Sequence, residues 1–166
     1  MTDTPEATDS ITDPSARFVS DYLLYLLAAA SDAASGQFHA TVRQAGLRVA
    51  EWRVLACLFD RDGAMITQLA GYALVEQSRL TRIIAQMDGR GLVSRRGDPQ
   101  DGRRVRVFLT QDGRELASQL VVKAQAHEAG LLKILQGSNG ARLKPALRSL
   151  LDALDPSAGP PETTDS

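Results

Sequence analysis

The chain has 166 residues, of which 43% are hydrophobic and 23% charged, and its net charge is −1. This composition is ordinary for one compact globular domain and excludes a low-complexity or fibrous chain. A single cysteine, Cys57, excludes an intramolecular disulfide and a cysteine-rich metal site. The first 15 residues are too polar and acidic for a secretory signal, and the longest apolar run, residues 22–30, is too short to cross a bilayer. We therefore expect a cytoplasmic protein with no membrane partner.

Both ends of the chain are expected to be disordered tails. Residues 1–12 and 155–166 are rich in polar and acidic residues and in proline, and they lack an apolar pattern. Asp13-Pro14 predicts a helix start, with a helix over residues 14–34. This helix is apolar around so much of its circumference that it needs cover on more than one side, for which a partner subunit is a natural source. Residues 37–44 are expected to form a separate short helix.

The middle of the chain predicts three helices. Residues 49–59 are expected to form a helix that buries four residues: Trp52, Leu55, Ala56 and Phe59. Residues 67–73 and 76–90 predict a helix–turn–helix pair, in which the second helix separates two faces. Its inner face contains Leu80, Ile83, Ile84 and Met87, and its opposite face contains Arg79, Arg82 and Gln86.

After this pair the hydrophobic period changes from that of a helix to that of a strand. Residues 92–96 and 103–109 predict two short strands, and the turn residues 97–102 between them predict a β-hairpin. Thr110 is expected to cap a helix over 111–135, which glycines at 137–140 end. A last helix should run to about 154 and, because of Pro145, either begin late or kink.

The arginines are concentrated around this helix pair and hairpin. Residues 76–106 contain eight arginines, no lysine and four acidic residues, so this stretch has a net charge of +4 and the remainder −5. A basic run is most often only a solvated surface. Arginine, however, offers a planar, forked group that recognises phosphate and guanine, so its exclusive use here favours a nucleic-acid partner.

A helix–turn–helix followed by a basic hairpin describes a winged helix, and we expect a mainly α fold with one small β-wing. An α-helix fits the major groove of DNA, where polar side chains near its start can reach the base edges. Here those residues are Gln77, Ser78, Arg79 and Arg82. Arg103, beside Gly102 at the hairpin tip, is suited to the neighbouring backbone or minor groove.

Several segments, in order and spacing, resemble the MarR (multiple antibiotic resistance regulator) family. They are Glu51-Trp52-Arg53-Val54-Leu55, Gln68-Leu69-Ala70, Leu80-Thr81-Arg82-Ile83-Ile84, Gly91-Leu92-Val93 with Arg95-Arg96, and Asp98-Pro99-Gln100-Asp101-Gly102-Arg103 with Leu109-Thr110 and Gly113. The chain departs from the family at Gly102, where the hairpin commonly has an arginine between Asp101 and Arg103. One backbone contact is lost there, although Asp101 remains available to orient Arg103.

The resemblance implies a homodimer that binds double-stranded DNA at a pseudo-palindromic operator. It implies terminal segments, 13–46 and 111–154, that form the dimer, and a DNA-binding lobe over 47–110. It adds Arg95 and Asp101 to the DNA-binding candidates, and it implies a repressor that a small effector releases from its operator. An aromatic carboxylate or its thioester would suit a pocket lined by five residues: Tyr25, His39, Arg43, Trp52 and Arg53. For each of these residues, simple packing or solvation is an equally good interpretation.

Other interpretations remain open. Cys57 could make the regulator redox-responsive, but its apolar surroundings in sequence favour a structural cysteine. The two histidines, His39 and His127, form too small a set for a metal site, and no cofactor is expected. No nucleophile–base pair, phosphate loop or paired-carboxylate motif indicates an enzyme. A ligand-independent regulator, or a winged-helix adaptor that binds protein instead of DNA, is the remaining alternative.

Overall fold

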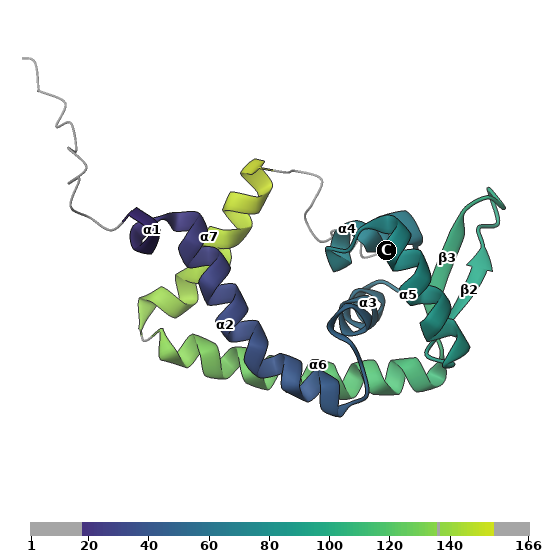
Figure 1. Ribbon diagram of the computed structural model, residues 1–166, viewed down its shortest axis with the longest axis horizontal. Coiled ribbons are helices and arrows are strands. Elements are labelled where there is room, and N and C mark those ends of the chain that lie inside the picture. Colours follow the sequence, from purple (N-terminus) through teal and green to yellow (C-terminus); the bar gives the residue numbers. More distant parts are fainter. Residues whose placement is uncertain (1–17, 136, 155–166) are drawn as a thin grey trace, which may run out of the picture. The chain divides into compact units, whose positions relative to one another are not determined.

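The computed structural model describes residues 18–135 and 137–154 (Figure 1). The two expected tails and the expected helix start at Asp13-Pro14 lie outside these residues. The chain divides into two compact units, residues 1–37 and 38–166, which we describe separately. The division into dimerisation segments and a DNA-binding lobe remains a prediction.

The first unit contains helix α1 (Phe18–Asp21) and most of helix α2 (Leu23–Gln44). The expectation of two helices, 14–34 and 37–44, is wrong, because α2 continues through Gly36 to Gln44. A glycine inside a helix costs only about 0.5–1 kcal/mol relative to alanine, and the burial of Phe38 and Val42 further along α2 outweighs this cost. Most of the large apolar residues described in this unit are exposed: Phe18, Val19, Tyr22, Leu23, Leu24, Tyr25 and Leu26.

The second unit contains the remaining helices and one sheet. In chain order its elements are α3 (Val49–Asp60), β1 (Ala64–Met65), α4 (Ile66–Ala73), α5 (Gln77–Gly89), β2 (Val93–Gly97), β3 (Val105–Leu109), α6 (Gln111–Ile134) and α7 (Ser138–Leu154). The sheet is antiparallel with the order β1-β3-β2, and the hairpin register pairs Arg96 with Arg106. The expected hairpin is confirmed. Strand β1 was not predicted, because two residues are too few to show a period.

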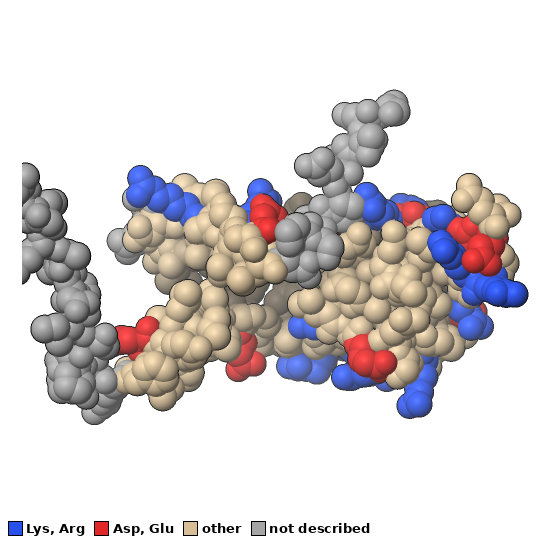
Figure 2. All heavy atoms as spheres, turned by 90° about the horizontal axis from the view of Figure 1, so that it is seen from above, with Lys and Arg blue, Asp and Glu red and all other residues tan. Residues whose placement is uncertain are grey.

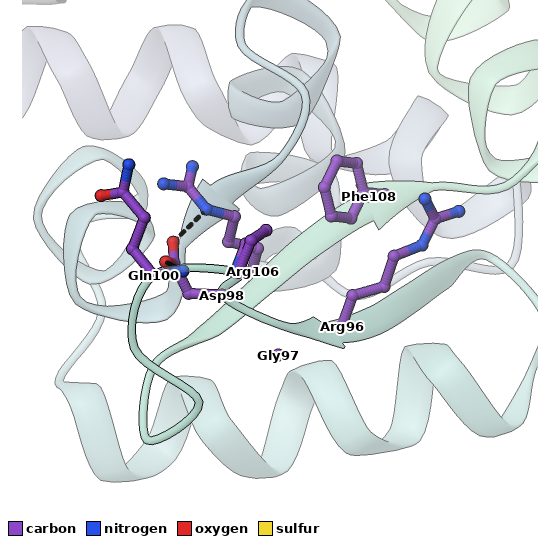
Figure 3. Close-up of a pocket in the computed structure, with 7 residues that line it drawn as sticks. Arg96, Gly97, Asp98, Gln100, Arg106 and Phe108 are labelled. Atoms are coloured by element: carbon purple, nitrogen blue, oxygen red, sulfur yellow. Dashed lines mark hydrogen bonds and ion pairs between the residues drawn. The ribbon is translucent and has the colours of Figure 1, made fainter.

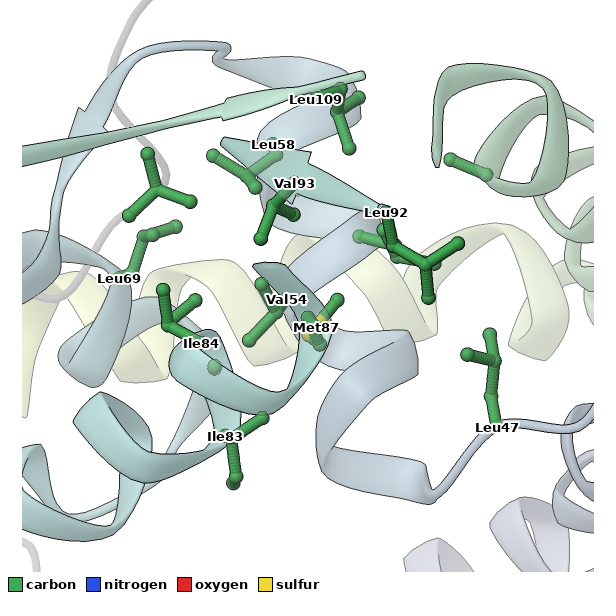
Figure 4. Packing of buried hydrophobic residues seen from close by; sticks show 14 of the residues in the cluster. Leu47, Val54, Leu58, Leu69, Ile83, Ile84, Met87, Leu92, Val93 and Leu109 are labelled. Carbon is green, nitrogen blue, oxygen red and sulfur yellow. The ribbon is translucent and has the colours of Figure 1, made fainter. Parts of the chain in front are cut away.

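The core of this unit lies between α3, α4, α5, α6 and the inner face of the sheet (Figure 4). The inner face predicted for α5 is buried as expected. The face predicted for α3 is displaced by one residue: the buried residues are Glu51, Val54, Leu55 and Leu58. Phe59 is 36% exposed and Trp52 only half-buried. The hydrophobic pattern missed this face because a charged residue, Glu51, occupies its first position.

The two last helices contain glycines in tight positions. Thr110 caps α6 as expected, since its hydroxyl accepts a hydrogen bond of 3.0 Å from the backbone N–H of Gly113. Helix α7 begins at Ser138 and contains Pro145, so of the two alternatives expected at Pro145, a late start or a kink, the late start is wrong. Gly140 does not break this helix. A Cβ at Gly140 would lie 2.9 Å from the carbonyl oxygen of Leu132, so the glycine lets the first turn of α7 pack closely on α6.

Candidate nucleic-acid interface

Helix α5 has a side-chain cap at its first turn. The carboxylate of Glu76 accepts hydrogen bonds from the backbone N–H groups of Ser78 (2.8 Å) and Arg79 (3.0 Å). The hydroxyl of Ser78 donates to the same carboxylate. These bonds, those from Ser78 first, hold the pKa of Glu76 below its usual value. The sequence analysis placed Glu76 inside the helix; the structure makes it the cap that fixes where α5 begins.

The outer face of α5 presents polar side chains to solvent. Gln77, Ser78, Arg79 and Arg82 are all exposed. Within the described residues, no hydrogen bond or ion pair engages the guanidinium group of Arg79 or Arg82. These two cations are therefore available to an external partner, as the helix pattern predicts.

The wing, residues 93–109, is held in shape by two aspartates near its tip. The carboxylate of Asp98 accepts hydrogen bonds from the backbone N–H groups of Gln100 (2.8 Å) and Asp101 (3.2 Å), and it pairs with Arg106. The bond from Gln100, followed by that from Arg106, lowers the pKa of Asp98. Arg106 also donates to the carbonyl of Gly63 (3.0 Å), which ties the wing to the loop before β1.

At the tip itself, Asp101 orders the backbone. It accepts a hydrogen bond of 3.1 Å from the backbone N–H of Arg103, and it pairs with the guanidinium of Arg104 at 3.3 Å. The guanidinium of Arg103 is exposed and, in the described part of the chain, has no such partner. Asp101 therefore orients Arg103 through the main chain, whereas its side-chain partner is Arg104.

An ion pair joins strand β2 of the wing to the last turn of α5. Arg95 of β2 pairs with Asp88 of α5 at 2.8 Å, so this DNA-binding candidate is partly engaged within the chain. Figure 2 shows basic side chains gathered at the end of the molecule where Figure 1 labels α5, β2 and β3. Acidic residues lie among them, which agrees with the mixed charge of residues 76–106.

The outer surface of the wing has a shallow hollow of about 360 Å³. Arg96, Asp98, Arg106 and Phe108 line it, and Asp98 points toward Arg106 across one end (Figure 3). The guanidinium of Arg96 lies 4.6 Å from the centre of the Phe108 ring, a cation–π contact that stiffens the strand pair.

The comparisons with known proteins agree with this geometry. The sequence model described as "MarR family" matches residues 47–105, from the start of α3 into the wing. A solved MarR family transcriptional regulator from Silicibacter pomeroyi DSS-3, SPO1453, is 60% identical; the match covers 83% of this chain and 98% of that chain, with a TM-score of 0.76. The chain belongs to the MarR family.

Two further relatives are more distant in sequence. BpsR of Bordetella bronchiseptica is 26% identical over 80% of this chain and 95% of its own, with a TM-score of 0.71; its structure concerns the regulation of DNA binding by 6-hydroxynicotinic acid. The transcriptional repressor IacR of Pseudomonas putida is 29% identical over 93 residues, which is 56% of each chain. The chain thus matches little more than half the length of that repressor. SPO1453 is named a transcriptional regulator, and IacR a transcriptional repressor.

The five effector-pocket candidates of this MarR chain do not all lie in one unit. Tyr25 is exposed in the unit of residues 1–37, whereas the others lie in residues 38–166. His39 is half-buried and Arg43 exposed. The guanidinium of Arg53 donates to the carbonyl of Ala73 (3.4 Å), so it extends toward the end of α4.

Trp52 belongs to an aromatic cluster that the sequence analysis did not predict. Its ring centre lies 5.5 Å from that of Phe38, which in turn lies 5.7 Å from that of His127. The three rings come from α3, α2 and α6. Aromatic residues far apart in the sequence give no signal of such a contact. The sequence places His127 on the apolar stripe of the helix over 111–135 and considers it as a metal ligand, but it does not predict its contact with Phe38.

Cys57 is held in its unreactive form. Burial, followed by the charge of Asp60, raises the pKa of its thiol to about 11. Because the thiolate is the reactive species, we expect a folded MarR chain to react slowly with a thiol reagent at pH 7 and much faster in denaturant. Rapid labelling of the native chain, at the rate of a free cysteine, would contradict this assignment.

The described residues form neither a metal site nor a membrane span. They contain no group of three or more histidine, cysteine or acidic side chains placed to hold a metal ion. None of the helices described is long and apolar enough to span a membrane.

Proposed function

We propose that the chain is a sequence-specific DNA-binding transcriptional regulator that represses its targets from a pseudo-palindromic operator. The observation that carries the proposal is the set of exposed guanidinium groups on one side of α5 and at the wing tip, Arg79, Arg82 and Arg103, none of which forms an ion pair within the described residues. Helix α5 enters the major groove, with Gln77 and Ser78 near the base edges. The wing carries Arg103 to the backbone or minor groove.

The regulator acts as a homodimer. The first unit exposes large apolar residues on α1 and α2, and the second unit exposes Leu151 and Leu154 on α7. A second copy of the chain, joined through residues 13–46 and 111–154, would cover such surfaces. Its two recognition helices would lie one duplex turn apart, roughly 34 Å. Light scattering at micromolar concentration tests this: a dimer is expected, and a monomer would overturn it.

Substitutions of Arg82 and Arg103 should separate the two kinds of DNA contact. Arg82→Ala removes a base contact, so we expect a loss of about 1–3 kcal/mol per site and relaxed specificity at one operator position. Arg103→Ala removes a backbone contact, so binding should weaken on all sequences and the salt dependence should become shallower. Binding titrations on an operator and on unrelated duplexes measure both. Unchanged operator affinity in both variants would contradict the docking.

An aromatic carboxylate, or its thioester, is the proposed effector class. Two observations support it: the BpsR structure concerns an aromatic acid, and Phe38 of the Phe38–Trp52–His127 cluster lies on α2, the helix that also contains His39 and Arg43. The ring of the effector would stack in that cluster, and Arg43 would meet its carboxylate. A ligand changes DNA affinity only if it binds the two states of the regulator differently.

The test adds a panel of benzoates, hydroxycinnamates and their thioesters to a preformed DNA complex. Release by one of them, lost in Arg43→Ala while DNA binding survives, is the expected result. A coupling of about 1–3 kcal/mol would change operator affinity some 5- to 150-fold. Release by mild peroxide alone, abolished by Cys57→Ser, would overturn the ligand proposal in favour of a redox-responsive regulator.

A further inference from the structure

A cleft beside the recognition helix contains an arginine that does not belong to that helix. It has a volume of about 280 Å³ and lies between the start of α3 and the outer face of α5. Its polar lining consists of Arg48, Arg79, Arg82 and Gln86, and its apolar wall of Val49, Ala50 and Ile83. All of these residues belong to the same compact unit, 38–166. The cleft therefore brings together three guanidinium groups, two from α5 and one from Arg48, which precedes α3.

Arg48 is held in this cleft by two neighbours. Its guanidinium donates to the buried carboxylate of Glu51 at 2.9 Å and to the side-chain oxygen of Gln86 on α5. Glu51 is itself fixed, because it also accepts from the backbone N–H of Arg48 (2.7 Å) and from the guanidinium of Arg90 (3.1 Å). The Arg48 side chain nevertheless remains 61% exposed. An arginine that is oriented and still accessible is prepared to bind a further anion.

The charges around the cleft favour an anion. Two carboxylates lower the positive charge of the cleft: Glu51, which is buried and pairs with Arg48, and Glu76, which interacts electrostatically with Arg82. Three guanidinium groups outnumber them, and those of Arg79 and Arg82 have no hydrogen bond or ion pair within the described residues. Guanidinium groups bind phosphate oxygens in a forked geometry. The apolar wall contains no aromatic ring on which a base or an aromatic acid could stack.

We propose that this cleft binds one phosphate of the DNA backbone, and that Arg48, the residue that precedes α3, engages it. The inference rests on the proposed function, since it assumes that α5 docks in the major groove. It adds a DNA contact outside the helix–turn–helix and wing. A phosphate held at the edge of α5 would fix how deeply the helix enters the groove, without itself selecting a sequence.

The test measures how the affinity for a labelled duplex of random sequence depends on salt. Fluorescence anisotropy would follow the wild-type chain and Arg48→Ala between about 50 and 200 mM salt. Each phosphate contact contributes about 0.9 to the slope of log K against log salt, so the slope should fall by about 0.9 for each cleft engaged. Arg48→Lys keeps a charge and should keep most of the slope, while its affinity falls because the fork is lost.

Two further variants make the result decisive. Arg48→Gln removes the charge but retains a hydrogen-bond donor for Glu51, so it replaces Arg48→Ala if the alanine variant unfolds. The slope of log K against log salt should fall by the same amount in both variants. Lys123→Ala, at an exposed position of α6, removes one positive charge away from the cleft and should leave the slope unchanged. If the wild-type chain binds with a steep slope and both charge-removing variants retain it, the cleft holds no phosphate. If the wild-type chain itself shows no salt-dependent binding, the proposed function fails as well.

Discussion

Replacing Gly113 by alanine is expected to destabilise the protein by about 3 kcal/mol, the upper range for an added group in a tightly packed site. A Cβ at this position would lie 1.9 Å from the carbonyl oxygen of Leu92. That oxygen belongs to the backbone and accepts a hydrogen bond from the N–H of Thr110 (3.2 Å), so it cannot turn aside. The start of α6 and the residue before β2 must therefore separate. A denaturant titration of the variant measures the loss.

The same helix provides a matched control. Gly130 lies in α6 with no atom within 4 Å of the position that a Cβ would take. Because alanine is the better helix former, Gly130→Ala should stabilise the chain by about 0.5–1 kcal/mol. If Gly113→Ala and Gly130→Ala unfold at the same denaturant concentration, the close approach of α6 to Leu92 is wrong.

Removing the carboxylate of Glu51 should have the second largest effect. Glu51 is 1% exposed and accepts hydrogen bonds from Arg48 and Arg90. Arg48 links it to α5, and Arg90 links it to the carbonyl of Gly46. The two arginines are 61% and 44% exposed and can turn to water once their partner is lost. We therefore expect Glu51→Ala to lower the free energy of unfolding by about 2–3 kcal/mol, in the range for hydrogen bonds to a charged group. This is less than the loss expected from breaking an ion pair whose two partners are both buried.

The contribution of Glu51 should also depend on pH. Burial raises the pKa of Glu51, but the hydrogen bonds from Arg48 and the charges of Arg48 and Arg90 lower it more, so its pKa is below the usual 4.5. The unfolded state then takes up a proton at higher pH than the folded state. The stabilisation is fully present above pH 4.5 and is lost as the pH falls through the folded-state pKa. The difference in unfolding free energy between the wild type and Glu51→Gln should therefore narrow in acid. A difference that stays constant from pH 7 to acid would contradict the charged state assigned to Glu51.

The sequence predicted those parts of the fold in which the hydrophobic pattern coincides with burial. The inner face of α5 and the hairpin turn after Gly97 are examples, because apolar spacing and turn residues determine them locally. The pattern failed where a charged residue is buried or a glycine is tolerated. Glu51 displaced the predicted face of α3, and the sequence predicted two helices, 14–34 and 37–44, where α2 continues through Gly36.

The candidate site also contains some residues that the sequence predicts and others that it does not. Exposed arginines on a helix face, such as Arg79 and Arg82, could be predicted from spacing alone. The carboxylates that shape the site could not: Glu76 caps α5, and Asp98 closes the wing turn onto Arg106. Their partners are backbone N–H groups or side chains on another strand, and a linear pattern contains no record of such contacts.

Selection of duplexes from a random library, with binding measured at two salt concentrations, tests the central claim most directly. If α5 and the wing of a two-fold dimer read DNA, the enriched sequences should contain an inverted repeat with half-sites about 10–10.5 base pairs apart. Affinity for these sequences should fall steeply as the salt concentration rises from about 50 to 200 mM. If no sequence is enriched and affinity does not depend on salt, the chain does not bind DNA as proposed, and its winged helix serves protein contacts instead.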